Sequence, residues 1–306
     1  MFIVFLLTIV LLGALQPVQT STNSKAVGYL NSPLVASLCS FMLGTLLLLL
    51  IILAVERGGW PELSGKLGEL PWWAWCGGIA GAAGITVNIL LFPKLGSMQT
   101  VLMPMVGQII AGLIIDSFGL FDTQAYPFTL LRFLGFAAVM VGVFYVVSHK
   151  GKHFRRKDTL VWQFIGNGAG AVLAMQPAMN SRLSLAIGSS LDASIFSFAS
   201  GTVVILLVCL LMKEHRPHVG KIFTARRPLY TLAGGPIGVL IVVGQTLLVT
   251  KVGVGLLTIL NIFGMLLCSV LIDKYGFLGT AKVEITKKKV FGLVLVLAGI
   301  VMLNVG

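Results

Sequence analysis

Amide and hydroxyl side chains interrupt the apolar runs of this sequence at spacings that suit a hydrogen-bonding ligand site. Gln16 and Thr20 are four residues apart, as are Gln176 and Asn180, so each pair lies on one face of a helix. A proline follows each glutamine directly and frees a backbone carbonyl for binding or bending. The alternative is that these side chains hydrogen-bond neighbouring helices and that the prolines only kink them.

Further amides lie inside apolar runs and extend this predicted site. Asn88 and Gln245 are equivalent positions in the two halves of the chain, and their alternative is also hydrogen bonding between helices. Polar groups inside a membrane mark substrate pathways because contact with lipid would cost free energy. The complete set predicted to bind substrate is Gln16, Thr20, Asn88, Gln108, Gln176, Asn180, Gln245 and Asn261.

Four charged residues have a spacing that suggests gates. Lys94 and Asp116 are 22 residues apart, or about 33 Å of helix, and Lys251 and Asp273 repeat that spacing. If the two helices pack antiparallel, Lys94 can pair with Asp273 at one membrane face and Asp116 with Lys251 at the other. We predict that these pairs open and close alternately. Interfacial anchoring of the helix ends is the alternative.

Other kinds of chemistry are disfavoured by the residues present. The ten acidic residues all lie outside the middle of the apolar runs, so a cation/proton antiporter built on a buried carboxylate is disfavoured. Histidines occur only in basic loops without further ligands, so no metal and no cofactor is predicted. No HExxH or GxSxG motif occurs and no catalytic residue is predicted, so the chain is not expected to be an enzyme.

The composition places all these residues in a polytopic membrane protein. Hydrophobic residues make up 57% and charged residues 10%, too few to solvate a soluble surface. The net charge of +12 then indicates which loops stay in the cytoplasm, where Lys and Arg are enriched, rather than nucleic-acid binding. Runs of about 20 apolar residues predict ten spans. They are residues 2–21, 31–55, 72–92, 97–116, 128–148, 160–180, 189–212, 230–249, 254–273 and 289–305.

The chain repeats itself at an offset of 157 residues, which predicts a duplicated five-helix unit. Matching pairs include Ser40-Phe41 with Ser197-Phe198, Gly44-Thr45 with Gly201-Thr202, Gly77/Gly81 with Gly234/Gly238, and Gly135/Gly142 with Gly292/Gly299. The Gly77/Gly81 spacing predicts close helix packing. Gln16-Pro17 matches Gln176-Pro177 at an offset of 160 instead, which predicts three extra residues around 24–30 in the first copy.

Two units of five spans, joined without an extra helix, must cross the membrane in opposite senses. We therefore predict an all-α fold of ten transmembrane helices in two inverted five-helix repeats, residues 1–149 and 160–306, joined by a basic cytoplasmic linker at 150–159. With both termini outside, 17 Lys and Arg residues lie on the cytoplasmic side and 5 outside. The positive-inside rule favours that orientation.

The repeated signature resembles the YdcZ-like family of the drug/metabolite transporter superfamily. It consists of Gln176-Pro177 with Asn180, then Ser-x-Leu-x-Ala-Ser-x-x-Ser-Phe, Gly-Gly-x-x-Gly and Ile-Asp-x-Phe-Gly. The match covers nearly the whole chain, once per half, so the chain is similar to a fused two-copy member. In the first half, Thr20 stands at the Asn position, and in the second half Tyr275 replaces the Phe. The resemblance implies a ten-helix transporter of the bacterial inner (plasma) membrane with a cavity between its halves, and it implies no particular substrate.

These observations predict a secondary transporter that works by alternating access between inverted repeats. The expected substrate is a small neutral, zwitterionic or anionic metabolite, and export is the expected direction. The alternatives are a flippase for lipid or lipid-linked substrates and a membrane scaffold without transport. Expected partners are the substrate and membrane lipids, with a homodimer left open and nucleic acid excluded.

Overall fold

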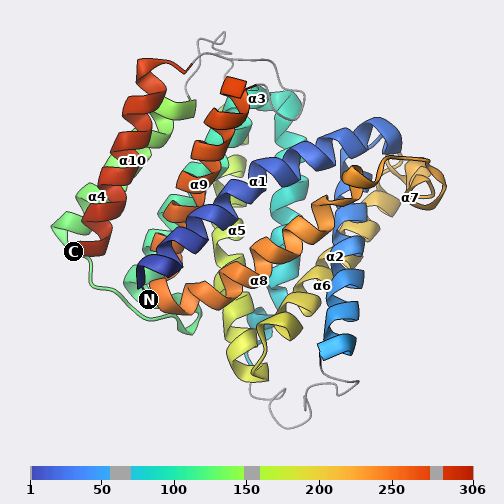
Figure 1. Cartoon of the computed structure of the whole chain (residues 1–306), viewed down its shortest axis with the longest axis horizontal. Coiled ribbons are helices and arrows are strands. Elements are labelled where there is room, and N and C mark those ends of the chain that lie inside the picture. The colour runs from blue at the N-terminus through green and yellow to red at the C-terminus, as the bar shows by residue number, and fades with distance from the viewer. Residues whose placement is uncertain (1, 56–69, 148–158, 276–284, 306) are drawn as a thin grey trace. The chain divides into compact units, whose positions relative to one another are not determined.

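The computed structural model describes residues 2–55, 70–147, 159–275 and 285–305 (Figure 1). Within these residues the chain forms α-helices, short 3-10 helices and turns, without a strand. The linker predicted at 150–159 lies almost entirely outside the described residues.

The long helices follow the predicted apolar runs closely. The α-helices are α1 (Phe2–Leu30), α2 (Pro33–Val55), α3 (Gly77–Phe118), α4 (Leu130–Val147), α5 (Thr159–Ile187), α6 (Ser190–Leu211), α7 (Lys221–Thr224), α8 (Gly234–Val252), α9 (Val254–Tyr275) and α10 (Lys287–Val305). The 3-10 helices are η3 (Trp72–Cys76), η4 (Leu120–Asp122), η5 (Arg216–His218) and η6 (Leu229–Leu232). Among the described residues, seven helical segments are long and apolar enough to cross a membrane. The chain is therefore a multi-pass membrane protein.

The structure differs from the ten predicted spans at α3. The spans predicted at 72–92 and 97–116 lie in η3 and in α3, which is one helix of 42 residues. Among its described residues, Thr100–Phe118 is long and apolar enough to cross a membrane. In the second copy, Gly253 has a φ of 81° and separates α8 from α9. Glycine adopts this left-handed conformation without steric cost. The helix of the first copy instead continues through the equivalent Gly96.

The turn before α2 and its repeat equivalent before α6 have the same backbone conformation and the same serine cap. Asn31 has a φ of 56° and its equivalent Gly188 a φ of 84°, values that Asn and Gly tolerate best. Ser32 Oγ then accepts a hydrogen bond of 3.2 Å from the backbone N–H of Val35. Ser189 Oγ accepts one of the same length from the N–H of Asp192. Serine at this position satisfies N–H groups that the first helical turn leaves unpaired.

The chain forms two compact units, and each takes segments from both predicted halves. Unit 1 contains Met1–Ala14, Val87–Met175 and Thr250–Gly306, and unit 2 contains Leu15–Thr86 and Gln176–Val249. The boundaries fall inside α1, α3, α5 and α8, so these four helices contribute residues to both units.

In unit 1, α4 and α10 lie side by side and approach closely at glycines (Figure 1). A Cβ at Gly142 would lie 2.6 Å from the carbonyl oxygen of Gly292, and one at Gly135 would lie 2.9 Å from that of Gly299. Any side chain at these positions would force the helices apart. The outer faces expose Phe133, Phe144, Phe291 and other apolar side chains, as lipid-facing helices do.

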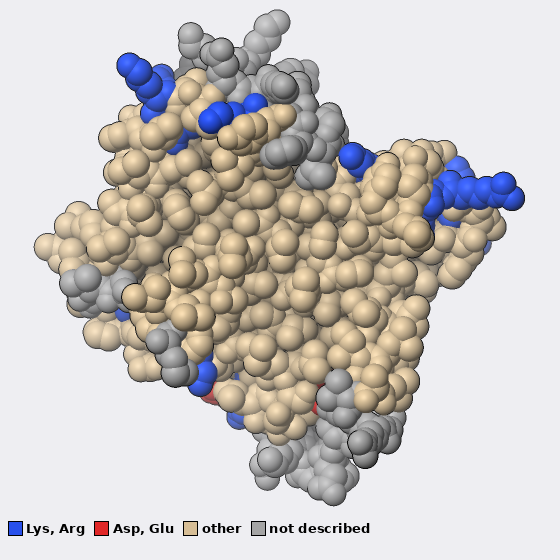
Figure 2. All heavy atoms as spheres, in the orientation of Figure 1, with Lys and Arg blue, Asp and Glu red and all other residues tan. Residues whose placement is uncertain are grey.

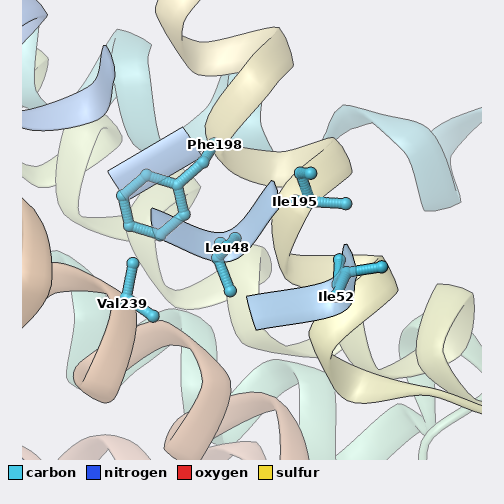
Figure 3. Close-up of a cluster of buried hydrophobic side chains, with 5 residues drawn as sticks. All are labelled: Leu48, Ile52, Ile195, Phe198 and Val239. Atoms are coloured by element: carbon cyan, nitrogen blue, oxygen red, sulfur yellow. The ribbon is translucent and has the colours of Figure 1, made fainter. Parts of the chain in front are cut away.

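In unit 2, α2 and α6 enclose a cluster of buried apolar side chains (Figure 3). Its members are Leu48, Ile52, Ile195, Phe198 and, from α8, Val239. Lipid is as apolar as these side chains, so the cluster stabilises the unit through close packing rather than through transfer out of water. This packing fixes the faces of α2 and α6 that carry the polar residues described next.

Candidate functional site: two amide and glycine clusters

Two amides of α5 lie against the glycine pair of α3 in unit 2. A Cβ at Gly77 would overlap Asn180 Oδ1, and one at Gly81 would lie 2.7 Å from Gln176 Nε2. The amide groups thus occupy the space that side chains on α3 would fill. Close packing at this glycine pair is confirmed. The structure brings the predicted residues Gln176 and Asn180 together.

The same arrangement occurs in the first copy, also within unit 2. A Cβ at Gly234 would overlap Asn23 Oδ1, and one at Gly238 would lie close to Gln19 Nε2. Gln19 Nε2 also donates a hydrogen bond of 3.0 Å to the carbonyl oxygen of Gly234. A second amide pair, Gln19 and Asn23 of α1, therefore lies against the glycine pair of α8.

These contacts correct the predicted register of the first helix. Gln19 and Asn23 are each 157 residues before Gln176 and Asn180, the same offset as in the rest of the repeat. Unit 1 gives the same register, because a Cβ at Gly13 would overlap the Asn261 carbonyl as one at Gly170 would overlap the Pro104 carbonyl. The first copy therefore has no insertion at 24–30. Gln16 and Thr20 are not the equivalents of Gln176 and Asn180.

The error arose from the repeated Gln-Pro dipeptide. Its two occurrences are three residues out of register, so the structural equivalent of Pro177 is Thr20. Gln16 is half-buried and Thr20 is exposed. The missed pair carried a usable signal, since Gln19-x-x-x-Asn23 has the spacing of Gln176-x-x-x-Asn180 at the constant offset.

Serines of α2 and α6 complete the two clusters. Asn180 is 1% exposed, and its Nδ2 donates a hydrogen bond of 3.2 Å to Ser197 Oγ. In the other cluster a Cβ at Gly234 would lie 3.0 Å from Oγ of Ser40, the equivalent of Ser197. Gln19, Asn23 and Gln176 are only half-buried, so part of each remains accessible. Each cluster combines two neutral amides and a hydroxyl, which can donate to and accept from a polar ligand.

Between α2 and α6, residues contact their own repeat equivalents. Thr45 Oγ1 lies 3.2 Å from Thr202 Oγ1, at a sequence separation of 157. The Phe41 and Phe198 rings have the same separation, with centroids 5.3 Å apart. The two helices run in opposite directions (Figure 1). The contacts between α4 and α10 are reciprocal. Gly135 lies against Gly299, the equivalent of Gly142, and Gly142 lies against Gly292, the equivalent of Gly135.

In unit 1, the predicted gate residue Asp116 is buried at the start of α9. Asp116 is 1% exposed, and its two carboxylate oxygens accept hydrogen bonds of 2.7 and 2.8 Å from the N–H groups of Val254 and Gly255. It therefore caps the first turn of α9. Its charged partner is Arg132, whose Nη2 lies 3.9 Å from Asp116 Oδ2, whereas Lys251 is exposed. The pair of Asp116 with Lys251 is not formed in this structure, and because the two pairs are predicted to open and close alternately, their role as gates stays a prediction.

Arg132 is also buried, and sequence reasoning missed it. Its guanidinium lies 4.9 Å from the centre of the Tyr126 ring. Tyr126 is in the segment after η4, and its backbone N–H donates to the Asp116 carbonyl at 2.8 Å. Burial, followed by the Asp116 carboxylate, raises the pKa of the Tyr126 phenol above its ordinary value, and the opposing effect of Arg132 is smaller. An arginine near the start of a span looks like an interfacial anchor in sequence, so nothing indicated this contact.

The remaining predicted residues are dispersed through the helices. Gln108 in α3 and Gln245 in α8 are half-buried, and Asn261 in α9 is buried. Lys94 is exposed, with its Nζ 5.6 Å from the Trp162 ring centre. The side chains of Asn88 and Asp273 lie outside the described residues.

A second buried carboxylate belongs to unit 2. Asp192, in the first turn of α6, is 2% exposed, and its Oδ2 has no hydrogen-bond partner in the described part of the chain. Its equivalent in the first copy is Val35. Asp116 and Asp192 therefore lie near the ends of helices but are more deeply buried than their sequence positions indicated.

Comparison with known proteins places the chain in a family. A family profile described as "Putative inner membrane exporter, YdcZ" matches it twice, at residues 4–145 and 161–302. The two matches are displaced by 157 residues at both ends, in agreement with the register of the structural contacts. No curated protein sequence matches the chain. A solved structure, titled only "Crystal structure of protein", is similar with a TM-score of 0.70 and 15% identity over 99% of this chain and 96% of that chain. This likeness shows a shared fold.

Proposed function

We propose a transport function from one established premise: the chain belongs to the YdcZ family of inner membrane exporters. The exported substrate is a small neutral, zwitterionic or anionic metabolite. Transport proceeds by alternating access between two inverted repeats of five apolar segments each, of which the third and fourth are joined in α3 in the first copy. The substrate class and this mechanism are both additions to the family assignment. No enzymatic step is part of this proposal.

The observation that carries the mechanism is the set of contacts between repeat equivalents. A two-fold rotation that exchanges two copies brings a residue near the axis against its own equivalent and makes other contacts reciprocal. The Thr45–Thr202 and Phe41–Phe198 pairs have the first property. The crossed glycine contacts of α4 and α10 have the second. Both sets join antiparallel helices, which supports repeats of opposite orientation in the membrane. Inverted repeats are the recurring architecture of secondary transporters.

The substrate class follows from the chemistry of the two amide clusters. Gln19, Asn23, Gln176 and Asn180 offer hydrogen-bond donors and acceptors without charge. A cation would need a carboxylate with free lone pairs. Asp116 uses both of its oxygens to cap α9, and Asp192, whose Oδ2 is unpartnered among the described residues, is not part of either amide cluster. Because Gln19 and Gln176 are half-buried, we assign them the direct contacts with substrate. Gln108, Gln245, Asn261 and Asn88 are proposed as further lining. The role of Lys94, Asp116, Lys251 and Asp273 as gates stays a prediction.

The test is ligand-dependent stability of the purified, detergent-solubilised chain. Metabolites are grouped by charge, and a bound ligand raises the unfolding temperature because it binds only the native state. At 100 times the Kd the gain is about 2.7 kcal/mol. We expect a saturable shift from a neutral, zwitterionic or anionic class that Gln176→Ala and Gln19→Ala each abolish. Gln124→Ala is the matched control, since Gln124 is exposed outside the clusters.

Two results would contradict this proposal. Shifts from cations alone would overturn the substrate class. A shift that survives both glutamine substitutions would overturn the site. Flux of the identified ligand in liposomes then separates a carrier from a protein that only binds it, and a response to lipid substrates alone would favour a flippase.

A further inference from the structure

The segment between α6 and α8 of unit 2, residues 212–233, is folded against α2. It contains η5, α7 and η6. Nδ1 of His215 lies 3.0 Å from Oγ of Ser32, the cap of α2. Nη2 of Arg227 donates to Cys39 Sγ at 3.0 Å and to the Ile222 carbonyl at 3.3 Å. This segment, which we call the α7 segment, therefore has a defined position beside the start of α2.

The α7 segment exposes apolar side chains among basic ones. Phe223 is 78% exposed, Leu229 83% and Tyr230 53%. The segment contains five basic residues and one acidic residue, Glu214. The basic residues are Lys213, Arg216, Lys221, Arg226 and Arg227. Figure 2 shows Lys and Arg side chains gathered at this end of the unit. Exposed aromatic and aliphatic side chains beside cations are typical of segments that lie in the interface of an anionic membrane.

Two buried nitrogen atoms of the segment have no hydrogen-bond partner among the described residues. They are Arg227 Nη1 and His218 Nδ1. A guanidinium nitrogen only donates, so Nη1 requires an acceptor. A buried donor without an acceptor is destabilising, and an anionic ligand would remove this cost if the guanidinium turned outward to meet it. Arginine suits phosphate in particular, because its planar group donates two parallel hydrogen bonds.

We propose that the α7 segment binds the phosphate head group of an anionic phospholipid. Arg226, which is exposed, and Lys221 make the first contacts with the head group, and Arg227 donates to it once its guanidinium turns outward. Phe223 and Leu229 enter the acyl region. The exposed apolar side chains select a lipid over free phosphate, because a soluble anion would leave them in water. This inference goes beyond the proposed export function and does not depend on it.

The experiment measures lipid preference of the full chain in nanodiscs that contain phosphatidylcholine with increasing phosphatidylglycerol. Bound lipid is counted by native mass spectrometry after the disc is released. Lys221→Gln with Arg226→Gln removes two charges but leaves the contacts of Arg227 with α2 intact. Each basic residue near an anionic surface contributes about 1 kcal/mol, or about fivefold in affinity, so we expect phosphatidylglycerol to bind about 25-fold more weakly.

The matched control is Lys287→Gln with Lys288→Gln, two exposed lysines at the start of α10. Equal losses in both double variants would show that only net charge matters and would overturn the site. Arg227→Gln is expected to remove the preference entirely. This change also breaks the contact of Arg227 with Cys39 in α2, so circular dichroism accompanies it. A variant with native helix content that keeps the full preference would overturn the role of Arg227.

Two further measurements, a salt titration and a competition with inorganic phosphate, use only the wild-type chain. Raising NaCl from about 0.1 M to about 1 M shortens the Debye length from about 10 Å to about 3 Å, so the preference should fall. Inorganic phosphate should compete poorly with phosphatidylglycerol. A preference insensitive to salt, no preference for phosphatidylglycerol, or displacement by inorganic phosphate at comparable concentration would each overturn the proposal.

Discussion

Replacing Asp116 by alanine tests whether this carboxylate acts mainly as a cap for α9. Its hydrogen bonds to the N–H groups of Val254 and Gly255 are 2.7 and 2.8 Å long, whereas Arg132 lies 3.9 Å away. Hydrogen bonds to a charged group contribute about 1.5–3 kcal/mol each. Loss of both, which also leaves Arg132 buried without its counter-charge, should lower the free energy of unfolding by about 3–5 kcal/mol.

Arg132→Gln should cost much less, about 1 kcal/mol. Asp116 keeps both backbone donors in this variant, and removal of the buried guanidinium also removes its desolvation cost. Lys251→Gln is the matched control. Lys251 is exposed, and a surface substitution changes stability by about 0.5 kcal/mol or less.

The assay is denaturant unfolding of the three purified variants in one detergent, followed by circular dichroism. The expected order of destabilisation is Asp116→Ala, then Arg132→Gln, then Lys251→Gln. A loss at Lys251 as large as that at Asp116, with Arg132→Gln silent, would refute the reasoning and favour an ion pair between Asp116 and Lys251. A loss at Arg132 that equals the loss at Asp116 would show that the ion pair outweighs the cap.

Three further predictions concern unit 2. Gly77→Ala should destabilise by about 1–3 kcal/mol because the new methyl overlaps Asn180, and adding Asn180→Ala should recover part of that loss in denaturant unfolding. A double-mutant cycle of Phe41→Leu and Phe198→Leu should give a coupling of about 0.5–1.5 kcal/mol, and additive losses would contradict the ring contact. Ser32→Ala should cost about 1 kcal/mol of unfolding free energy through loss of the α2 cap, and an unchanged stability would contradict that role.

Apolar run length predicted most of the helices because a span must satisfy its backbone hydrogen bonds internally. The junction within α3 was not predictable in this way. Gly96 and Gly253 are the same residue type at equivalent positions, yet only the chain at Gly253 leaves the helix. At Gly253 a Cβ would lie 3.0 Å from Asp116 Oδ2, so the break coincides with a contact that only the folded chain brings together.

The candidate site was predicted in one half and misplaced in the other. Gln176 and Asn180 were identified from their residue types and spacing. Their equivalents Gln19 and Asn23 were missed, because a local identity at Gln16 was given more weight than the constant offset of the repeat. Burial of Asp116 and Asp192 was also missed. A charge at the end of an apolar run has the same sequence context whether it faces water or a neighbouring helix.

Opposite membrane orientation of the two repeats is the central claim, and thiol labelling at equivalent positions tests it most directly. Lys94 and Lys251 are 157 residues apart and both exposed. Lys94→Cys and Lys251→Cys are treated on intact cells with a maleimide that does not cross the membrane, with the wild-type chain as the blank. We predict that the cysteine at 251 reacts from outside and the cysteine at 94 only after permeabilisation. Reaction of both from the same side would contradict inverted repeats.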